Sequence, residues 1–382
     1  MPASLSIVAD QQISFAAEVF SRFGDVSLVD GRSIDRQTIK NADVLLVRSV
    51  TRVNKDLLNE SPVRFVGSAT SGIDHVDLNY LESADIKFTH APGSNARSVA
   101  EYVLSSLFVL AEQQGFSLSK KTMGIIGLGQ VGSRVKRFMD ALGVKCLLND
   151  PPLAQQDNNQ VWSSLEQTLS ADIISLHVPL VVDGEFPTVN LVNKNFLSRL
   201  KPDVIFINTS RGEVINEMDL MDYKHSNPDS KLILDVWRNE PDIDMTLLQK
   251  ASISTPHIAG YSFDGKLKAT QKLSDALCDF THTERQPLAI QFPDQESGVI
   301  DLVDNDDMVQ LAVLQSYDVR SDAIALRDML NLTEDKRIGY FDYLRKTYPV
   351  RHEFKNWTIR SKKISNNSKQ TLKGLGFNLE VK

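Results

Sequence analysis

Short apolar runs alternate with amphipathic stretches along most of the chain. The runs Leu5 to Ala9, Val44 to Val47 and Val63 to Ser68 are predicted strands, and Ile13 to Phe23 is a predicted helix. This alternation is typical of a parallel sheet that is covered by helices. A first lobe is therefore predicted over residues 1–93.

A second alternating unit follows a loop at residues 92–95. Ser98 and Glu101 have the spacing of a capping box, which predicts that a long helix begins at this point. The pattern predicts a second lobe over residues 94–257, after which the chain returns to the first lobe over residues 258–285. The predicted strands of the second lobe are Met123–Ile126, Val144–Leu148, Ile173–Leu176, Val204–Asn208, Leu232–Asp235 and Ile253–Thr255.

The tail has a different character from residue 286 onward, because charges become frequent and long apolar strands stop. Residues 286–382 are predicted to form a small α/β domain. The fold class is thus α/β, with two doubly wound, Rossmann-like parallel-sheet lobes and a small C-terminal α/β domain. The predicted tail elements are helices at Met308–Leu314, Ala323–Leu330 and Tyr340–Tyr348, and strands at Trp357–Ile359 and Phe377–Leu379.

Composition and charge argue against a nucleic-acid-binding, membrane or secreted protein. A net charge of −7 and a pI near 5.6 argue against a nucleic-acid partner, which usually meets a basic face. No apolar run reaches the length of a membrane span, and the first residues lack a secretory pattern. Cys146 and Cys278 stand in apolar contexts and are predicted to be buried free thiols, which favours a reducing cytoplasm.

A glycine-rich turn is the strongest local motif. Gly127, Gly129 and Gly132 follow a predicted strand and open a helical stretch, as in dinucleotide-binding turns. The diphosphate would lie at the helix N-terminus, where N–H groups favour anions. Asp150 ends the next strand, where an acidic residue binds the ribose hydroxyls of NAD and repels the extra phosphate of NADP. The sequence predicts NAD as the cofactor.

Three polar side chains follow successive predicted strands, whose carboxyl ends meet at one edge of such a sheet. His257 suits proton transfer, Glu240 can orient its ring, and Arg211 can hold a carboxylate through paired N–H bonds. Together they predict oxidation of a 2-hydroxyacid. Taken singly, Arg211 is equally compatible with a surface ion pair, Glu240 with a helix start, and His257 with a buried, hydrogen-bonded ring.

The segments GIIGLGQVG, NTSRGEVI, DVWRNEP and TPHIAG resemble the D-isomer-specific 2-hydroxyacid dehydrogenase family. The resemblance implies that Arg211 binds substrate, that Glu240 partners the histidine and that His257 is the general acid/base. It also implies an active site between the lobes that closes by a hinge. The cofactor positions that it implies are Gly127, Gly129, Gln130, Val131, Gly132, Asp150, Val178, Thr209, Arg211, Asp235 and Gly260.

Weaker family features lie at LLVRSVT, GSATSGIDHVD and APGSNA. Other segments, among them VRSVTRVN, HIAGY and SYDVRSDAIALR, resemble a member that acts on a phosphorylated hydroxyacid. The resemblance implies substrate contacts at Ser49, Thr70 and Tyr261, and a tail that forms a homodimer. Arg48, Arg52 and Arg97 are candidates for the phosphate, with Arg48 first because it adjoins Ser49.

Several alternatives stay open at this point. His177 also ends a predicted strand and is the rival base, although a position that lines the cofactor is favoured. His75 stands between Asp74 and Asp77, but this spacing matches no strong metal motif, and no metal is expected. The chain is also compatible with another family enzyme that carries a regulatory tail, or with an NAD-sensing interaction protein.

Overall fold

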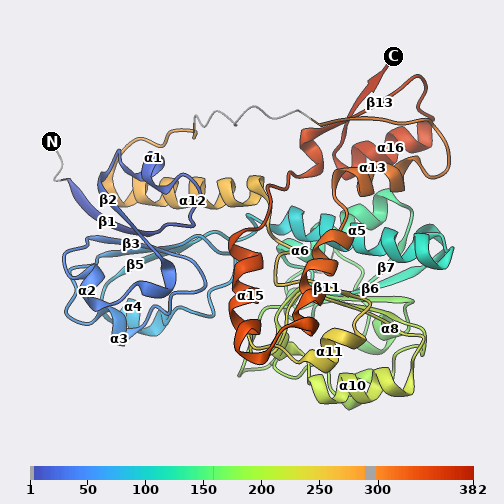
Figure 1. Cartoon of the computed structure of the whole chain (residues 1–382), viewed down its shortest axis with the longest axis horizontal. Coiled ribbons are helices and arrows are strands. Elements are labelled where there is room, and N and C mark those ends of the chain that lie inside the picture. Colours follow the sequence, from blue (N-terminus) through green and yellow to red (C-terminus); the bar gives the residue numbers. More distant parts are fainter. Residues whose placement is uncertain (1–3, 158, 289–297) are drawn as a thin grey trace. The chain divides into compact units, whose positions relative to one another are not determined.

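The computed structural model describes residues 4–157, 159–288 and 298–382. They divide into two compact units, the first with residues 1–95 and 262–294 and the second with residues 96–261 and 295–382 (Figure 1). Residues 262–288 are grouped with the first unit, the expected domain bounds stay a prediction, and residues 289–297 of the expected tail domain lie outside the described part. Among the described residues, no helix is long and apolar enough to cross a membrane.

The first unit is built on a parallel five-stranded sheet in the order β2-β1-β3-β4-β5. Apolar side chains alternate between its faces, so that α1 and α12 cover one face and α2, α3 and α4 cover the other. The strand order reverses between β1 and β3. The strands are β1 (Leu5–Asp10), β2 (Gly24–Val29), β3 (Val44–Val47), β4 (Phe65–Ser68) and β5 (Lys87–His90). The helices are α1 (Ala16–Phe20), α2 (Arg36–Ile39), α3 (Lys55–Leu58), α4 (Leu78–Ser83) and α12 (Phe263–Thr281).

The second unit holds a parallel six-stranded sheet in the order β11-β10-β9-β8-β6-β7, which reverses between β6 and β8. Its inner strands are buried on both faces, as their continuous apolar runs predict. The strands are β6 (Thr122–Ile126), β7 (Lys145–Asn149), β8 (Ile173–Leu176), β9 (Ile205–Asn208), β10 (Lys231–Leu234) and β11 (Ile253–Ser254). Its main helices are α5 (Ala96–Gln114), α6 (Gln130–Ala141), α7 (Pro151–Ala154), α8 (Leu165–Leu169), α9 (Lys194–Leu197), α10 (Glu217–Ser226) and α11 (Met245–Lys250).

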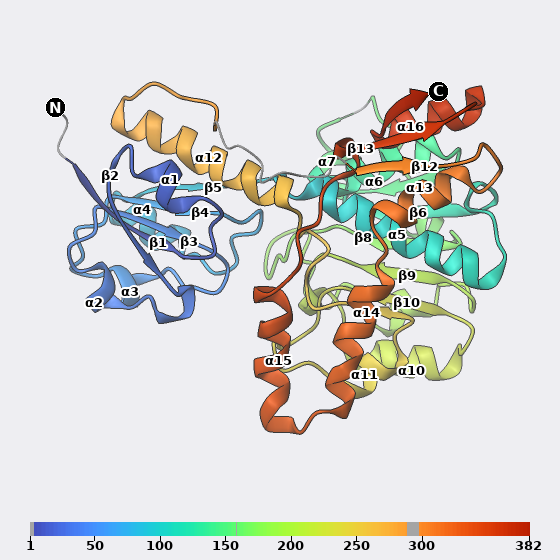
Figure 2. The same cartoon turned by 45° about the horizontal axis from the view of Figure 1, so that its top comes forward.

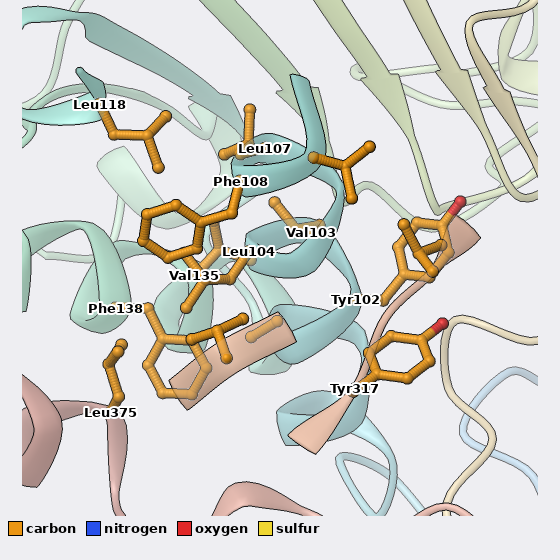
Figure 3. Close-up of a cluster of buried hydrophobic side chains, with 14 of the residues drawn as sticks. Tyr102, Val103, Leu104, Leu107, Phe108, Leu118, Val135, Phe138, Tyr317 and Leu375 are labelled. Carbon is orange, nitrogen blue, oxygen red and sulfur yellow. The ribbon is translucent and has the colours of Figure 1, made fainter. Parts of the chain in front are cut away.

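The C-terminal segment, residues 298–382, packs onto the rest of this second unit, where α13 meets α5 and α16 meets α6 (Figure 2). Its helix α14 also meets β11. It contributes to the same hydrophobic core, in which Tyr317 and Leu375 lie among side chains of α5 and α6 such as Tyr102 and Phe138 (Figure 3). Its parallel sheet has the order β12-β13-β14. The elements are β12 (Gly298–Asp301), α13 (Met308–Ser316), α14 (Arg320–Arg327), α15 (Glu334–Lys346), β13 (Trp357–Ser361), α16 (Asn366–Leu375) and β14 (Asn378–Val381).

The fold class is confirmed, but two local expectations are wrong. Helix α1 is much shorter than Ile13 to Phe23, because Phe15 takes a left-handed conformation at φ 59° and β2 begins at Gly24. Ser98 and Glu101 do not form a capping box, since α5 already begins at Ala96. Both side chains instead hold the C-terminal segment: Ser98 donates to Glu353, and Glu101 accepts the N–H of Phe354.

Candidate active site

The carboxyl ends of the strands in the second unit carry the residues with candidate chemistry. Gly127 follows β6, Asp150 follows β7, Arg211 lies in the loop after β9, and His257 lies just beyond β11. Parallel strands all point the same way, so these residues share one edge of the sheet. The strand order reverses between β6 and β8, and ligands of this kind of sheet usually bind outside the carboxyl ends of the strands at such a reversal.

The glycine turn fits a dinucleotide diphosphate. Gly127 has φ +88°, and a Cβ there would lie 2.7 Å from the carbonyl oxygen of His177. A Cβ on Gly132 would lie 2.0 Å from the carbonyl of Gly127, so helix α6 packs tightly on the strand. At Gly129 a Cβ would meet open space, which leaves the backbone accessible to a phosphate.

Asp150 is held against this turn. One carboxylate oxygen accepts the N–H of Leu128 at 2.7 Å, and the other caps α7 by accepting the N–H of Leu153 at 3.1 Å. The carboxylate therefore lies beside the turn that receives the diphosphate. Contact of Asp150 with the ribose of NAD stays a prediction.

The structure brings His257 and Glu240 into contact, and their role as a catalytic pair stays a prediction. Nδ1 of His257 lies 2.7 Å from Oε2 of Glu240, and Oε1 of Glu240 accepts the N–H of Trp237 at 2.9 Å. His257 takes a left-handed conformation with φ 57°, which is uncommon for a residue other than glycine and clusters at functional sites. Because Nδ1 is engaged, exchange of a proton with substrate falls to Nε2.

The electrostatics of this pair favour an ionised carboxylate. Burial raises the pKa of Glu240, but the neighbouring His257 and then Arg345 outweigh burial, and the net shift is downward. Glu240 thus stays charged over the neutral range. A fixed carboxylate at Nδ1 orients the ring and stabilises the imidazolium that forms when His257 accepts a proton.

The loop of Arg211 packs directly on the loop of Glu240. A Cβ on Gly212 would lie 2.0 Å from the backbone of Trp237, so only glycine allows this approach. Asn208 fixes the turn, since its side chain donates to the carbonyl of Arg211 at 2.9 Å and accepts the N–H of Ser210 at 3.0 Å. Sequence reasoning missed the role of Asn208, although a polar residue at the end of an apolar strand is a usable signal.

Asp235 holds the loop that carries His257 in place through hydrogen bonds. It is 1% exposed, and its carboxylate accepts the N–H groups of Ile258 and Ala259 at 2.8 and 3.0 Å and the hydroxyl of Thr255 at 2.6 Å. The N–H of His257 in turn donates to the carbonyl of Asp235. Asp235 therefore shapes the turn that carries the base, and its place near the nicotinamide stays a prediction.

His177 is poorly suited to act as a base. Hydroxyls of Ser175 and Thr209 contact its Nε2 and Nδ1 at 2.9 and 3.2 Å. Burial lowers the pKa of His177 to about 3, so its ring is neutral and cannot readily accept a proton. Its backbone abuts Gly127, which fits a position that lines the cofactor crevice; Val178 and Thr209 are half-buried beside it.

In the first unit, the predicted substrate residues share one sheet edge. Val47 and Ser68 are paired across β3 and β4, so Ser49 and Thr70 each stand two residues beyond a register pair. Thr70 donates to the carbonyl of Gly72 at 2.7 Å, and its hydroxyl also contacts that of Ser68 at 2.6 Å. Ser49 is exposed.

The three arginines that are candidates for binding the substrate phosphate lie in different surroundings. Arg48 follows β3 at the strand-order reversal, where its charge lowers the pKa of Asp10 against the larger effect of burial. Arg97 is committed to Glu101 at 3.0 Å and to the carbonyl of Leu375 at 2.6 Å, so it is a structural residue. Arg52 is exposed.

The metal alternative finds no support in the described residues. His75 contacts the hydroxyl of Ser68 through Nε2 at 2.9 Å. Within the described ranges, no group of three or more His, Cys, Asp or Glu side chains is arranged to hold a metal ion.

Both cysteines are free: Cys278 is buried, as expected, whereas Cys146 is only partly buried because it lies on the outer strand β7.

Comparisons with known proteins agree with this geometry. Residues 95–259 match the NAD binding domain of the D-isomer specific 2-hydroxyacid dehydrogenases, and residues 295–376 match a domain of unknown function (DUF3410). The chain is 42% identical over 382 residues to the erythronate-4-phosphate dehydrogenase of Hahella chejuensis, covering 99% of this chain and 100% of that protein. It is 40% identical to that of Klebsiella pneumoniae, with 98% of each chain covered.

Solved structures share the fold. The NAD+-bound 3-phosphoglycerate dehydrogenase of Entamoeba histolytica has a TM-score of 0.64 at 25% identity, over 73% of this chain and 96% of that chain. The D-lactate dehydrogenase of Aquifex aeolicus, complexed with NAD and lactic acid, has a TM-score of 0.61 at 24% identity, over 72% of this chain and 96% of that chain.

The glycine turn and the matched domain make NAD the cofactor. The chain therefore belongs to the D-isomer specific 2-hydroxyacid dehydrogenase family and is an NAD-dependent dehydrogenase.

Proposed function

We propose that the enzyme oxidises 4-phospho-D-erythronate to 2-oxo-3-hydroxy-4-phosphobutanoate with NAD, a step toward pyridoxal 5'-phosphate. The observation that carries the proposal is identity of 42% to an erythronate-4-phosphate dehydrogenase over 99% of this chain, tail included. The pairing of His257 with Glu240 supports catalytic competence, because it supplies an oriented histidine that can take the hydroxyl proton.

In this account three side chains do the chemistry. Arg211 binds the substrate carboxylate through paired N–H bonds and polarises the C2 oxygen. Nε2 of His257 takes the proton of the C2 hydroxyl, and Glu240 stabilises the resulting imidazolium. Bound NAD supplies the acceptor for the hydride that leaves C2. Charge balances because one proton remains on His257 and one hydride leaves with the cofactor.

The same proposal names the residues that select the substrate. Ser49, Thr70 and Tyr261 contact the hydroxyacid, and Arg48 pairs with the distal phosphate. Its position beyond β3, where the strand order reverses, supports a ligand contact at that point.

The cofactor contacts extend around the crevice at β6 and β8. The glycine turn receives the diphosphate, and Asp150 binds the ribose hydroxyls. The remaining cofactor contacts of the proposal are Gln130 and Val131, which open helix α6, and Val178, Thr209, Arg211, Asp235 and Gly260, which lie in loops that follow strands of the six-stranded sheet.

We further propose that the enzyme is a homodimer formed through the C-terminal segment and that it works in the cytoplasm. The two free thiols support a reducing compartment. Light scattering tests the dimer: a particle mass near twice 42.7 kDa is expected, and a mass of 42.7 kDa at every concentration contradicts it.

The reaction is tested with purified protein, NAD and 4-phospho-D-erythronate. The expected result is one NADH formed for each 2-oxo acid, which phenylhydrazine traps and mass spectrometry identifies. Absence of NADH, with NAD binding intact by fluorescence titration, contradicts the proposal and favours a non-catalytic NAD-binding protein.

A further inference from the structure

The C-terminal segment reaches the catalytic loops through the end of α15. The guanidinium carbon of Arg345 lies 5.9 Å from the centroid of the Tyr261 ring. Tyr348, which follows the same helix, packs edge-on against that ring at 5.6 Å and 87°. Tyr261 therefore meets two side chains of the C-terminal segment four residues after the catalytic His257.

Tyr348 is itself held firmly. Its hydroxyl donates to Asp322 of α14 at 2.9 Å, and Tyr317 donates to the same carboxylate oxygen at 2.7 Å. Tyr317 belongs to the buried core shared with α5 (Figure 3). The contact with Tyr261 is thus anchored in the core of the second unit.

Arg345 is held as a cation at this place. Burial opposes its charge, but Tyr261 and Glu240 outweigh burial, and the pKa of Arg345 is raised. The groups whose charge bears on it are Tyr261, Glu240 and Asp342. Its Nε is shielded from water and has no hydrogen-bond partner within the part of the chain that the structure describes. A donor that is shielded from water without a hydrogen-bond partner lowers the stability of the fold, and such groups are rare in native proteins.

We propose that Arg345 is a positioning residue for catalysis, which holds Tyr261 in place at the end of the loop that carries His257. The C-terminal segment then completes the active site of its own subunit, in addition to any part in dimerisation. Arg345 acts through Tyr261 and Glu240 rather than by touching the reacting atoms. The inference rests on the proposed use of the His257–Glu240 pair as acid/base.

The test replaces Arg345 with Gln and with Lys and measures kcat and KM separately. The substrate is the hydroxyacid that the unmodified enzyme oxidises fastest, whichever acid that is, so failure of the proposed substrate does not affect the test. Arg345→Gln is expected to lower kcat/KM by about tenfold or more, the effect of losing one partly buried charged contact. Arg345→Lys keeps the charge and is expected to recover part of that loss.

The pH profile separates a positioning role from a purely structural one. Loss of the cation makes the His257–Glu240 pair easier to protonate, so the acid limb of kcat/KM is expected to move to higher pH in Arg345→Gln. Lys336→Gln removes one charge from an exposed position on the same helix and is expected to leave the acid limb unchanged. NAD binding, measured by fluorescence titration, is expected to persist in all three variants.

A double-mutant cycle with Tyr261→Phe tests the route of action. If Arg345 acts through Tyr261, the fold-loss of kcat/KM in the double variant is smaller than the product of the fold-losses in the two single variants. Equal kcat/KM and an unmoved acid limb in Arg345→Gln overturn the proposal. An equal loss of kcat/KM in Arg345→Gln and Lys336→Gln also overturns the proposal, because it would show only that α15 is destabilised.

Discussion

Nδ1 of His257 lies 2.7 Å from Oε2 of Glu240, although the two residues are 17 positions apart and follow different strands. The second oxygen of Glu240 accepts the N–H of Trp237, so the carboxylate cannot rotate without losing a bond. This geometry favours His257 as the proposed base over His177, whose ring nitrogens both face hydroxyls.

Replacement of His257 by Asn is expected to lower kcat by about a hundredfold or more, the usual effect of losing a positioned acid/base. Asn is chosen because it tolerates the left-handed backbone at this position better than Ala. Steady-state kinetics measure the loss, and fluorescence titration with NAD is expected to show retained binding. The matched control is His177→Asn. Near-normal turnover of His257→Asn together with inactivity of the control reverses the assignment.

Cofactor choice is expected to depend on the charge of Asp150. The unmodified enzyme should prefer NAD over NADP by at least about tenfold in kcat/KM, roughly 1.4 kcal/mol. Asp150→Ser keeps a cap for α7 but removes the charge, so the preference should shrink. Asp140→Asn, an exposed carboxylate on α6, serves as the control. Equal use of both cofactors by the unmodified enzyme refutes the assignment.

Arg48 is expected to distinguish phosphorylated from unphosphorylated substrate. One charge-assisted contact contributes about 1.5 to 3 kcal/mol, so Arg48→Ala should lower kcat/KM for the phosphorylated acid by about 10- to 150-fold. The unphosphorylated analogue should be almost unaffected, and Arg52→Ala should change neither value. Equal losses of Arg48→Ala on both substrates would show that Arg48 supports the lobe instead of binding phosphate.

Stability should depend on pH through Glu101, which is buried in α5 between Arg97 and Arg351. Burial raises the pKa of Glu101 to about 7, although Arg351 and Arg97 lower it. An acid with a raised folded-state pKa contributes stability at low pH, and this contribution is lost as pH rises from about 4.5 to 7.

Glu101→Gln is therefore expected to remove about 1 to 3 kcal/mol of pH dependence in the free energy of unfolding between pH 5 and 8. Urea unfolding at the two pH values measures it, with Glu112→Gln on the exposed face of the same helix as control. A Glu101→Gln variant whose stability changes with pH as steeply as that of the unmodified protein contradicts the burial argument.

Much of the fold follows from local pattern. The apolar run Ile173–Leu176 is a strand with the predicted ends, because a strand buried on both faces needs little beyond continuous apolar side chains. Strand β2 was not predicted, since its exposed positions break the apolar run. The predicted capping box at Ser98 and Glu101 was wrong because capping is judged from local spacing alone. Their actual partners, Glu353 and Phe354, lie more than 250 positions away.

The site shows the same division between local and long-range signals. The glycine turn and the Arg211, Glu240 and His257 motifs are short, and the parallel sheet brings their strand ends to one edge. The approach of Arg345 to Tyr261 depends on packing of α15 far along the chain, and no spacing in the sequence signals it. Asn208 and Asp235 are visible as polar strand ends, but their partners require coordinates.

The most direct test of the central claim is a comparison of kcat/KM with NAD for 4-phospho-D-erythronate, unphosphorylated D-erythronate and 3-phospho-D-glycerate. The account predicts the highest value for 4-phospho-D-erythronate, by about tenfold or more over each of the others. An equal or higher value for 3-phospho-D-glycerate would make the chain a different member of the family and contradict the account.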